Sequence, residues 1–178
     1  MIGFLAMRAF IRCSLILFFC ALAACDRTPV YQWQVVESPD KTFTVSLPGN
    51  PTSKDTPTRL RTGESFTAHQ LTARLKGVSY AISWWEDPSL VNESAERVLT
   101  LMRDRGLAPS KASLLGEHST TFRGYPARDV IALAGGHAAY DNRIVLVRSR
   151  VYSLMVVDGS GRHDFPNVKR FYNSLVLR

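Results

Sequence analysis

The chain has 178 residues, of which 46% are hydrophobic and 21% are charged, values typical of a folded globular protein. Its formal net charge is +7, and without residues 1–24 it keeps 20 basic and 15 acidic residues, a charge of +5. The three cysteines are Cys13, Cys20 and Cys25, so the sequence beyond residue 25 excludes disulfides and cysteine-ligated metal sites.

The N-terminal segment has the pattern of an export signal. Arg8 and Arg12 precede an apolar run over residues 13–24, and Leu22-Ala23-Ala24-Cys25 ends it. A bilayer span takes about 20 apolar residues, so this run is too short for a permanent membrane helix. Met7 is an alternative start of translation. An ordinary secretory leader, cleaved after small residues, is the alternative interpretation of the whole segment.

Leu22-Ala23-Ala24-Cys25 resembles the lipobox of bacterial lipoproteins. The resemblance implies a signal peptide over residues 1–24, cleavage before Cys25, and acyl chains on Cys25 that attach the protein to the membrane. It places the protein on the periplasmic side. Asp26 resembles the inner-membrane retention signal of enterobacterial lipoproteins and favours the inner membrane. Export excludes nucleic acid as a partner.

Residues 25–41 contain Pro29 and Pro39 and little periodicity, which predicts a tether between the membrane and the domain. Tyr31, Trp33 and Val35 alternate with polar residues, which leaves open that part of this segment pairs as an edge strand.

Alternating apolar residues predict strands over residues 42–47, 65–75 and 78–84. Residues 52–63 are polar and are predicted as a loop. From Asn92 the period becomes helical, and Asn92 or Ser94 is the expected N-cap. Gly106 is the expected left-handed helix stop. The apolar stripe of this helix is Ala95, Val98, Leu99 and Met102.

The second half of the chain predicts four more strands and a final helix. The strands are expected over residues 112–121, 127–134, 140–147 and 151–157. The apolar stripe of the C-terminal helix is Phe165, Val168, Tyr172 and Leu175. Short turns between neighbouring strands indicate antiparallel pairing. We therefore expect one α+β domain over residues 42–178, an antiparallel sheet of about six to seven strands flanked by helices.

Three markers occur in order along this domain: residues 43–51 (Phe-x-Val-x-Leu-Pro-Gly-x-Pro), residues 124–129 (Gly-Tyr-Pro-Ala-Arg-Asp), and residues 150–154 followed by residues 171–175. Together they resemble the fold shared by the photosystem II extrinsic oxygen-evolving protein, a Ran-binding nuclear import factor and many bacterial lipoproteins. The resemblance implies an antiparallel sheet between helical layers and a protein that binds or stabilises partners. It carries no functional residue to this chain.

Polar residues of the domain show no catalytic signature. His69, His118, His137 and His163 lack metal-ligand spacing, although His137 with Asp141 or His163 with Asp164 are conceivable pairs. Asp158-Gly159-Ser160-Gly161 differs from a Gly-x-Ser-x-Gly nucleophile elbow and is expected to be a turn. We expect no catalytic residue, no metal site and no cofactor.

Two sets of residues are candidate contact surfaces. Alternation sends one indole of Trp84-Trp85 into the core and the other outward, where it could contact a ligand or partner or pack under a loop. Arg143, Arg148 and Arg150 crowd one predicted hairpin and could meet phosphate headgroups or an acidic partner, or simply be solvated.

The sequence therefore favours a lipid-anchored, non-catalytic envelope protein that binds or assists another envelope component. The alternative is a small-ligand carrier with a pocket near the end of the Trp84-Trp85 strand.

Overall fold

The computed structural model describes residues 32–59 and 65–178. The chain divides into two units, residues 1–30 and residues 31–178, and all described residues belong to the second. The predicted signal peptide and the lipobox with Cys25 lie outside the described residues. Within residues 32–59 and 65–178, no helix is long and apolar enough to cross a membrane.

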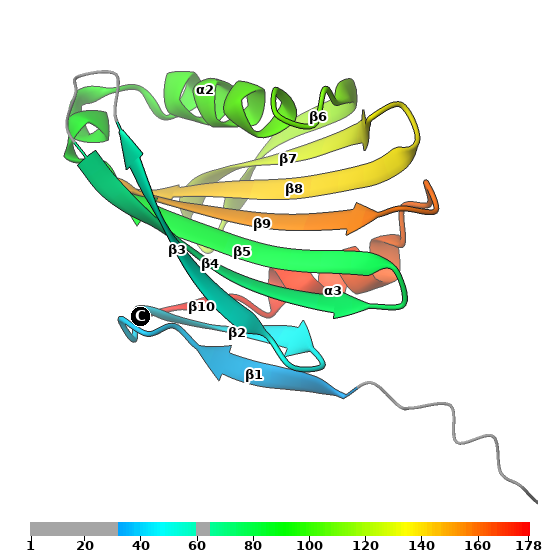
Figure 1. The fold of residues 1–178 in the computed structure, drawn as a ribbon. Coiled ribbons are helices and arrows are strands. Elements are labelled where there is room, and N and C mark those ends of the chain that lie inside the picture. The colour runs from blue at the N-terminus through cyan, green and yellow to red at the C-terminus, as the bar shows by residue number, and fades with distance from the viewer. Residues whose placement is uncertain (1–31, 60–64) are drawn as a thin grey trace, which may run out of the picture. The chain divides into compact units, whose positions relative to one another are not determined.

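A seven-stranded antiparallel sheet forms the centre of the domain (Figure 1). Across the sheet the strands are β3 (Thr52–Arg59), β4 (Ser65–Leu75), β5 (Val78–Glu86), β9 (Arg150–Asp158), β8 (Ala138–Val147), β7 (Tyr125–Ala134) and β6 (Ser113–Phe122). Tight turns join several neighbours. In the β6–β7 turn, Arg123 and Gly124 both have positive φ, 52° and 86°, as a two-residue hairpin turn requires.

Helix α2 (Ala95–Leu107) covers one face of this sheet, preceded by the short 3-10 helix η2 (Pro88–Asn92). Ser94 is the N-cap, since its hydroxyl accepts a hydrogen bond from the amide of Arg97. Val98, Leu99 and Met102 are buried as predicted, against strands β7 and β8.

The other face carries α3 (Phe165–Asn173) and a second, three-stranded sheet. This small sheet has the order β1 (Trp33–Glu37), β2 (Phe43–Pro48) and β10 (Val176–Leu177). Phe43 packs edge-on against Trp84 with ring centroids 4.9 Å apart, and Phe171 packs edge-on against Tyr80 at 5.8 Å. These aromatic rings fill the core between the two sheets and α3.

The predicted tether contains a paired strand. β1 lies within residues 25–41 and pairs antiparallel with β2 from Trp33, opposite Pro48, to Glu37, opposite Thr44. It is an edge strand, the possibility that the alternation of Tyr31, Trp33 and Val35 left open. Trp33 is half-buried, with its ring 5.2 Å from that of Tyr80.

The predicted polar loop over residues 52–63 was wrong in its first part. Residues Thr52–Arg59 form β3, paired with β4 from Thr52, opposite Thr72, to Arg59, opposite Ser65. β3 is the edge of the sheet and most of its residues are exposed, so backbone pairing holds it without apolar alternation.

Two consecutive residues of β7, Arg128 and Asp129, form ion pairs on opposite faces of the sheet. Arg128 is only 2% exposed and donates hydrogen bonds to Thr100 Oγ1 (2.8 Å) and to Glu96, both on α2. Asp129 faces the other side and accepts two hydrogen bonds of 2.7 Å from Arg143, beneath α3. The marker over residues 124–129 thus contains one ion-pairing residue for each face.

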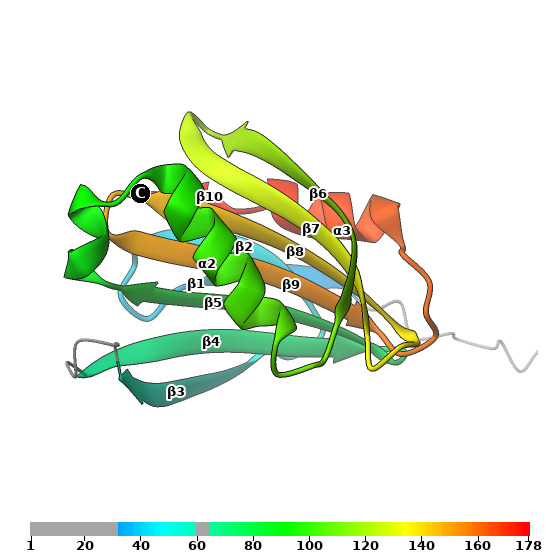
Figure 2. The ribbon, with the colours of Figure 1, turned by 90° about the horizontal axis from the view of Figure 1, so that it is seen from above.

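The predicted fold class is confirmed: the domain is α+β, with an antiparallel sheet flanked by helices. Figure 2, seen from above, shows α2 crossing the sheet, and Figure 1 shows α3 and the small sheet on the opposite side. The domain therefore has three layers, with an apolar core on each side of the central sheet.

The two phenylalanines of α3 provide a test of this packing. Phe171 is fully buried, whereas Phe165, which the sequence placed on the apolar stripe, is 53% exposed. We expect Phe171→Ala to lower the free energy of unfolding by about 3–5 kcal/mol, because it leaves a cavity in the core. Phe165→Ala is the control and should cost less than about 1 kcal/mol. Urea denaturation measures both, and equal losses would contradict the packing of α3.

Candidate functional site

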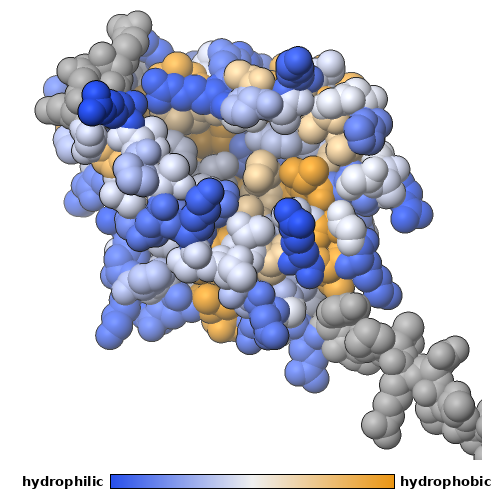
Figure 3. All heavy atoms as spheres, viewed as in Figure 1, coloured by the Kyte–Doolittle hydropathy of each residue, from blue (hydrophilic) through white to orange (hydrophobic). Residues whose placement is uncertain are grey.

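An open groove lies on the α2 side of the central sheet. Helix α2 contacts β7 and β8, and Figure 2 shows β3 and β4 beside the helix, not beneath it. The groove between the helix and these strands has a volume of about 260 Å³. Figure 3 shows this side of the molecule hollowed below α2, with hydrophobic residues inside the hollow. The lining residues are Thr58, Phe66, Ala68, Ser83, Trp85, Met102, Arg105, Gly106, Asn142, Ile144 and Ser153.

Two aromatic side chains form the outer wall of the groove. Phe66 of β4 and Trp85 of β5 have ring centroids 6.3 Å apart, and both are half-buried. Met102 of α2 and Ile144 of β8, both buried in the core on this face, line the inner side. Such half-buried aromatic walls suit an apolar group of a partner, because its burial removes apolar surface from water on both sides.

The floor of the groove is polar. Gln70 Nε2 donates to Ser83 Oγ (3.0 Å), and Ser153 Oγ donates to Asn142 Oδ1 (2.9 Å). Ser83 and Ser153 are opposite each other in the β5–β9 register. Asn142 Nδ2 in turn donates to the hydroxyl of Tyr140 (3.2 Å). These side chains cross four strands and give an apolar groove a few fixed hydrogen-bonding groups, which is the usual basis of specificity in a binding site.

Gly106 closes the inner end of the groove. A Cβ atom at Gly106 would lie 2.9 Å from the hydroxyl oxygen of Tyr140, too close for an undisturbed side chain. The expectation that Gly106 is a left-handed stop was wrong, because α2 runs on to Leu107 and its C-cap is Ala108 with φ −58°. Close approach to the sheet, and not helix termination, is the physical role of this glycine. Because Gly106 has no side chain, it leaves room for the Tyr140 hydroxyl, and burial raises the pKa of this hydroxyl.

The two tryptophans separate as alternation predicted. Trp84 is 2% exposed in the core on the α3 side, between Phe43 and His69, whose ring stacks on it at 5.2 Å. Trp85 faces the α2 side and lines the groove. Of the pair, Trp85 is therefore the one that a partner can reach.

The three arginines do not form one surface. Arg143 lies in the middle of β8 and binds Asp129, whose carboxylate raises the pKa of the guanidinium. Its guanidinium also stands 4.8 Å from the ring centre of Tyr172. Arg150 binds Asp40 (3.0 Å) and Glu86 (3.4 Å), and Arg148 is exposed in the turn. Arg143 precedes the β8–β9 turn by several residues, and this spacing places it under α3 and away from the hairpin tip.

The histidines were paired differently from either expectation. His163 Nδ1 lies 2.9 Å from Asp141 Oδ2, whereas Asp164 caps α3 through the amide of Asn167. Within the described ranges, no group of three or more His, Cys, Asp or Glu side chains could hold a metal ion. Residues 158–161 form a turn in which Asp158 Oδ1 accepts a 2.8 Å hydrogen bond from the Ser160 amide.

Sequence reasoning missed most of the groove. Its lining comes from β3, β4, β5, β8, β9 and α2, so no single stretch contains it. The available signal was polar residues inside apolar strands, such as Ser153 between Tyr152 and Leu154, and Asn142 in β8. Because both faces of these strands are covered, a polar residue there requires a partner.

The His163–Asp141 pair predicts a pH-dependent stability. Asp141 is buried, and burial raises its pKa although the hydrogen bond from His163 opposes the rise. The folded state therefore binds this proton more tightly than the unfolded state, and the free energy of unfolding falls as pH rises from about 4 through the raised pKa. We expect His163→Gln to steepen this fall and to cost about 2–3 kcal/mol at neutral pH, because the buried carboxylate loses a partner.

Asp141→Asn in the His163→Gln background is the control. It removes the titrating group, so the added pH dependence should disappear when urea denaturation is followed between pH 4 and pH 7. A slope that persists in the double variant would assign the effect to another carboxyl group.

No protein-family model and no curated protein matches the sequence. Among solved structures, the domain is similar to cyanobacterial PsbP from Synechocystis sp. PCC 6803, with a TM-score of 0.56, 11% identity, and coverage of 89% of this chain and 99% of that one. A Pseudomonas aeruginosa protein of unknown function matches with a TM-score of 0.46 and 12% identity over 83% of this chain and 98% of that one. At such identity the likeness to PsbP concerns the fold alone. The domain has a PsbP-like fold.

Proposed function

We propose that the chain is a lipid-anchored, non-catalytic protein that faces the periplasm and binds another envelope component through the groove beside Trp85. The observation that carries the binding role is the groove itself: two half-buried aromatic rings stand above a hydrogen-bonded polar floor, on a part of the sheet that α2 leaves uncovered. Arg105 at the rim is exposed and suits an acidic group of the partner beside the inserted apolar one.

The anchor is proposed from the sequence. Leu22-Ala23-Ala24-Cys25 at the end of a short apolar run supports lipidation of Cys25. Two or three acyl chains hold a protein durably on a bilayer, whereas one chain binds reversibly. Asp26 supports the inner membrane as the location.

The small-ligand carrier is the second candidate, and the position of the groove at Trp85 favours it. Its size favours the partner-binding role instead. Pockets for small ligands usually measure about 300–1,000 Å³ and enclose most of the ligand. A volume of about 260 Å³ on an open face matches one or two side chains of a protein partner better.

Lipidation is tested on the full chain expressed in a bacterium with lipoprotein processing. We expect a mature product that begins at Cys25 and carries the mass of its acyl chains, found in the membrane fraction. Cys25→Ser should lose the lipid, while Cys20→Ser, which alters a cysteine within the leader, should change nothing in the mature product. An unmodified soluble product, or one that retains residues 1–24, would exclude the anchor.

Partner binding is tested by photo-crosslinking in intact cells. A photoreactive residue at Thr58, which lines the groove, should crosslink to an envelope protein. The same residue at Asp55, which pairs with His69 on the opposite face of the sheet, is the control and should not. Trp85→Ala should reduce the Thr58 crosslink strongly, because loss of an aromatic anchor costs on the order of 2 kcal/mol.

Leu115→Ala changes an exposed apolar residue on β6, away from the groove, and should leave the crosslink intact. Crosslinks of equal yield from Thr58 and Asp55, or a yield insensitive to Trp85→Ala, would exclude the groove as the contact surface. A product with a small molecule and no protein would support the carrier.

A further inference from the structure

Hydrogen-bond donors remain free on the floor of the groove beside Trp85. Ser83 Oγ accepts from Gln70 Nε2 (3.0 Å), and its own proton has no acceptor in the part of the chain that the structure describes. Asn142 Nδ2 carries two protons and donates one of them to the hydroxyl of Tyr140 (3.2 Å). Reversing either amide would move the free protons along this row of side chains but would not use them up. The floor therefore offers at least two donors to a group placed above it.

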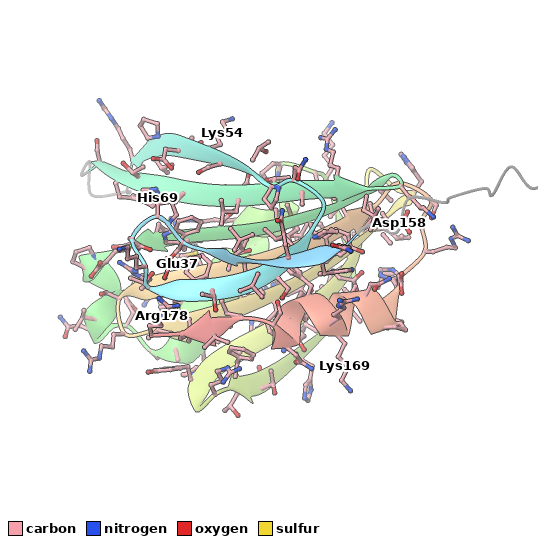
Figure 4. All side chains as sticks on the ribbon, turned by 90° about the horizontal axis from the view of Figure 1, so that it is seen from below. Glu37, Lys54, His69, Asp158, Lys169 and Arg178 are labelled. Atoms are coloured by element: carbon pink, nitrogen blue, oxygen red, sulfur yellow. The ribbon has the colours of Figure 1, made fainter. Side chains whose placement is uncertain are left out.

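The groove also has a positive charge at its rim. Arg105 is the only charged residue among the described residues that line it, and Arg105 is exposed. None of the described carboxylates forms an ion pair with this guanidinium. Lys54 of β3, labelled in Figure 4, is exposed and opposite Gln70 in the sheet, so it adds a second cation on the same face. Free donors and unpaired positive charge together favour an anionic acceptor.

An occupant of the groove must combine an apolar group with this anion in a small space. The rings of Phe66 and Trp85, with centroids 6.3 Å apart, present apolar surface, and the whole groove measures about 260 Å³. An internal aspartate or glutamate has the anion but little apolar surface, and an internal apolar residue has a neutral backbone. The last residue of a protein chain has both, because its apolar side chain and the terminal carboxylate share one Cα atom.

Gln70 provides an acceptor for the peptide bond of such a residue. Gln70 is half-buried and directly opposite Ser83 on the next strand. Its Oε1 atom receives no hydrogen bond from the described residues, since its printed neighbour Ser83 contacts Nε2. A terminal residue whose carboxylate lies over Ser83 and Asn142 can donate its backbone N–H to this oxygen. A small organic acid lacks that donor, so the floor fits a peptide end better than a free acid.

We propose that the groove beside Trp85 binds the C-terminal residue of a protein partner. The large apolar side chain of this residue lies against Phe66 and Trp85, and its carboxylate lies between the floor donors and Arg105. The inference rests on the partner-binding part of the proposed function and does not require the lipid anchor. Since a chain has one terminal carboxylate, this recognition selects partners by their last residue and is lost when the partner is extended.

Binding is measured by fluorine NMR on the full chain, purified from bacterial cells and labelled with 5-fluorotryptophan. The chain has three tryptophans. Trp85 lines the groove, whereas Trp84 and Trp33 belong to the core on the α3 side. Trp85→Phe identifies the groove signal, and the signals of the other two tryptophans are internal controls for the integrity of the core.

The probe is the tripeptide acetyl-Ala-Ala-Phe with a free terminal carboxylate, and its matched control is the same tripeptide with a terminal amide. We expect the acid to shift the Trp85 signal saturably and to leave Trp84 and Trp33 unchanged. The amide should bind roughly tenfold more weakly, because it lacks the charge-assisted hydrogen bonds of the carboxylate. 3-Phenylpropionate, which has the ring and the carboxylate but no amide N–H, should also bind more weakly. Equal binding of acid and amide, or tighter binding of phenylpropionate, would overturn the proposal.

Variants of α2 test the role of the charge. Arg105→Gln should weaken binding of the acid roughly tenfold and leave binding of the amide unchanged, because the guanidinium acts on the carboxylate alone. Arg97→Gln is the matched control: Arg97 is another exposed arginine of α2, but it pairs with Glu93 (3.4 Å) and does not line the groove. It should change neither affinity. An equal loss for acid and amide in Arg105→Gln would contradict recognition of the carboxylate.

The crosslink from Thr58 separates this inference from the proposed function. Arg105→Gln should weaken that crosslink in cells, as Trp85→Ala does. A crosslink that is sensitive to Trp85→Ala but not to Arg105→Gln would overturn the terminal carboxylate alone and leave partner binding in place. Carboxylate-dependent binding of the tripeptide without any crosslinked protein in cells would support the peptide site and contradict the envelope partner.

Discussion

The central sheet must bury both of its faces, and this requirement organises the domain. Consecutive residues of β9 illustrate it, since Val151 packs toward α2 and Tyr152 toward α3 and the small sheet. Helix α2 is too short to cover the whole of its face of the sheet. Thirteen helical residues extend about 20 Å, whereas seven strands spaced about 4.8 Å apart are roughly 29 Å wide. The uncovered remainder is the groove beside Trp85, so the candidate site follows from the dimensions of the layers.

The parts of the fold that could be predicted from the sequence are those with an apolar period. β2, β5 and α2 were found because side chains such as Phe43, Ile82 and Val98 recur at the spacing of their element. β3 was missed because backbone pairing alone holds an edge strand, and Lys54 and Pro57 give it the composition of a loop. Two-residue β10 has no period at all.

The candidate site was predictable only where one residue carried the signal. Alternation placed Trp85 outside the core, but its neighbours Phe66, Met102 and Asn142 come from separate elements, and only the register of the sheet brings them together. Closeness in sequence also wrongly grouped Arg143 with Arg148 and Arg150. Arg143 and Arg148 are five positions apart, and residues that far apart along an extended strand are distant in space. Contacts between segments that are far apart in the chain follow from the tertiary fold, and the pattern of a single sequence does not reveal them.

Arg128 and Asp129 carry opposite charges on opposite faces of β7, so electrostatics as well as packing favours the observed register of this strand. A slip of one position would carry Arg128 to the α3 side and bring the Asp129 carboxylate under α2. Glu96 and Glu117 would then lose the guanidinium that both contact, and only Arg103 would remain beside Glu117. Small alanines in this strand discriminate weakly between alternative alignments by packing alone. The loss of the Arg128 contacts and the added carboxylate both disfavour the misaligned sheet, so the charges of β7 help to select one register.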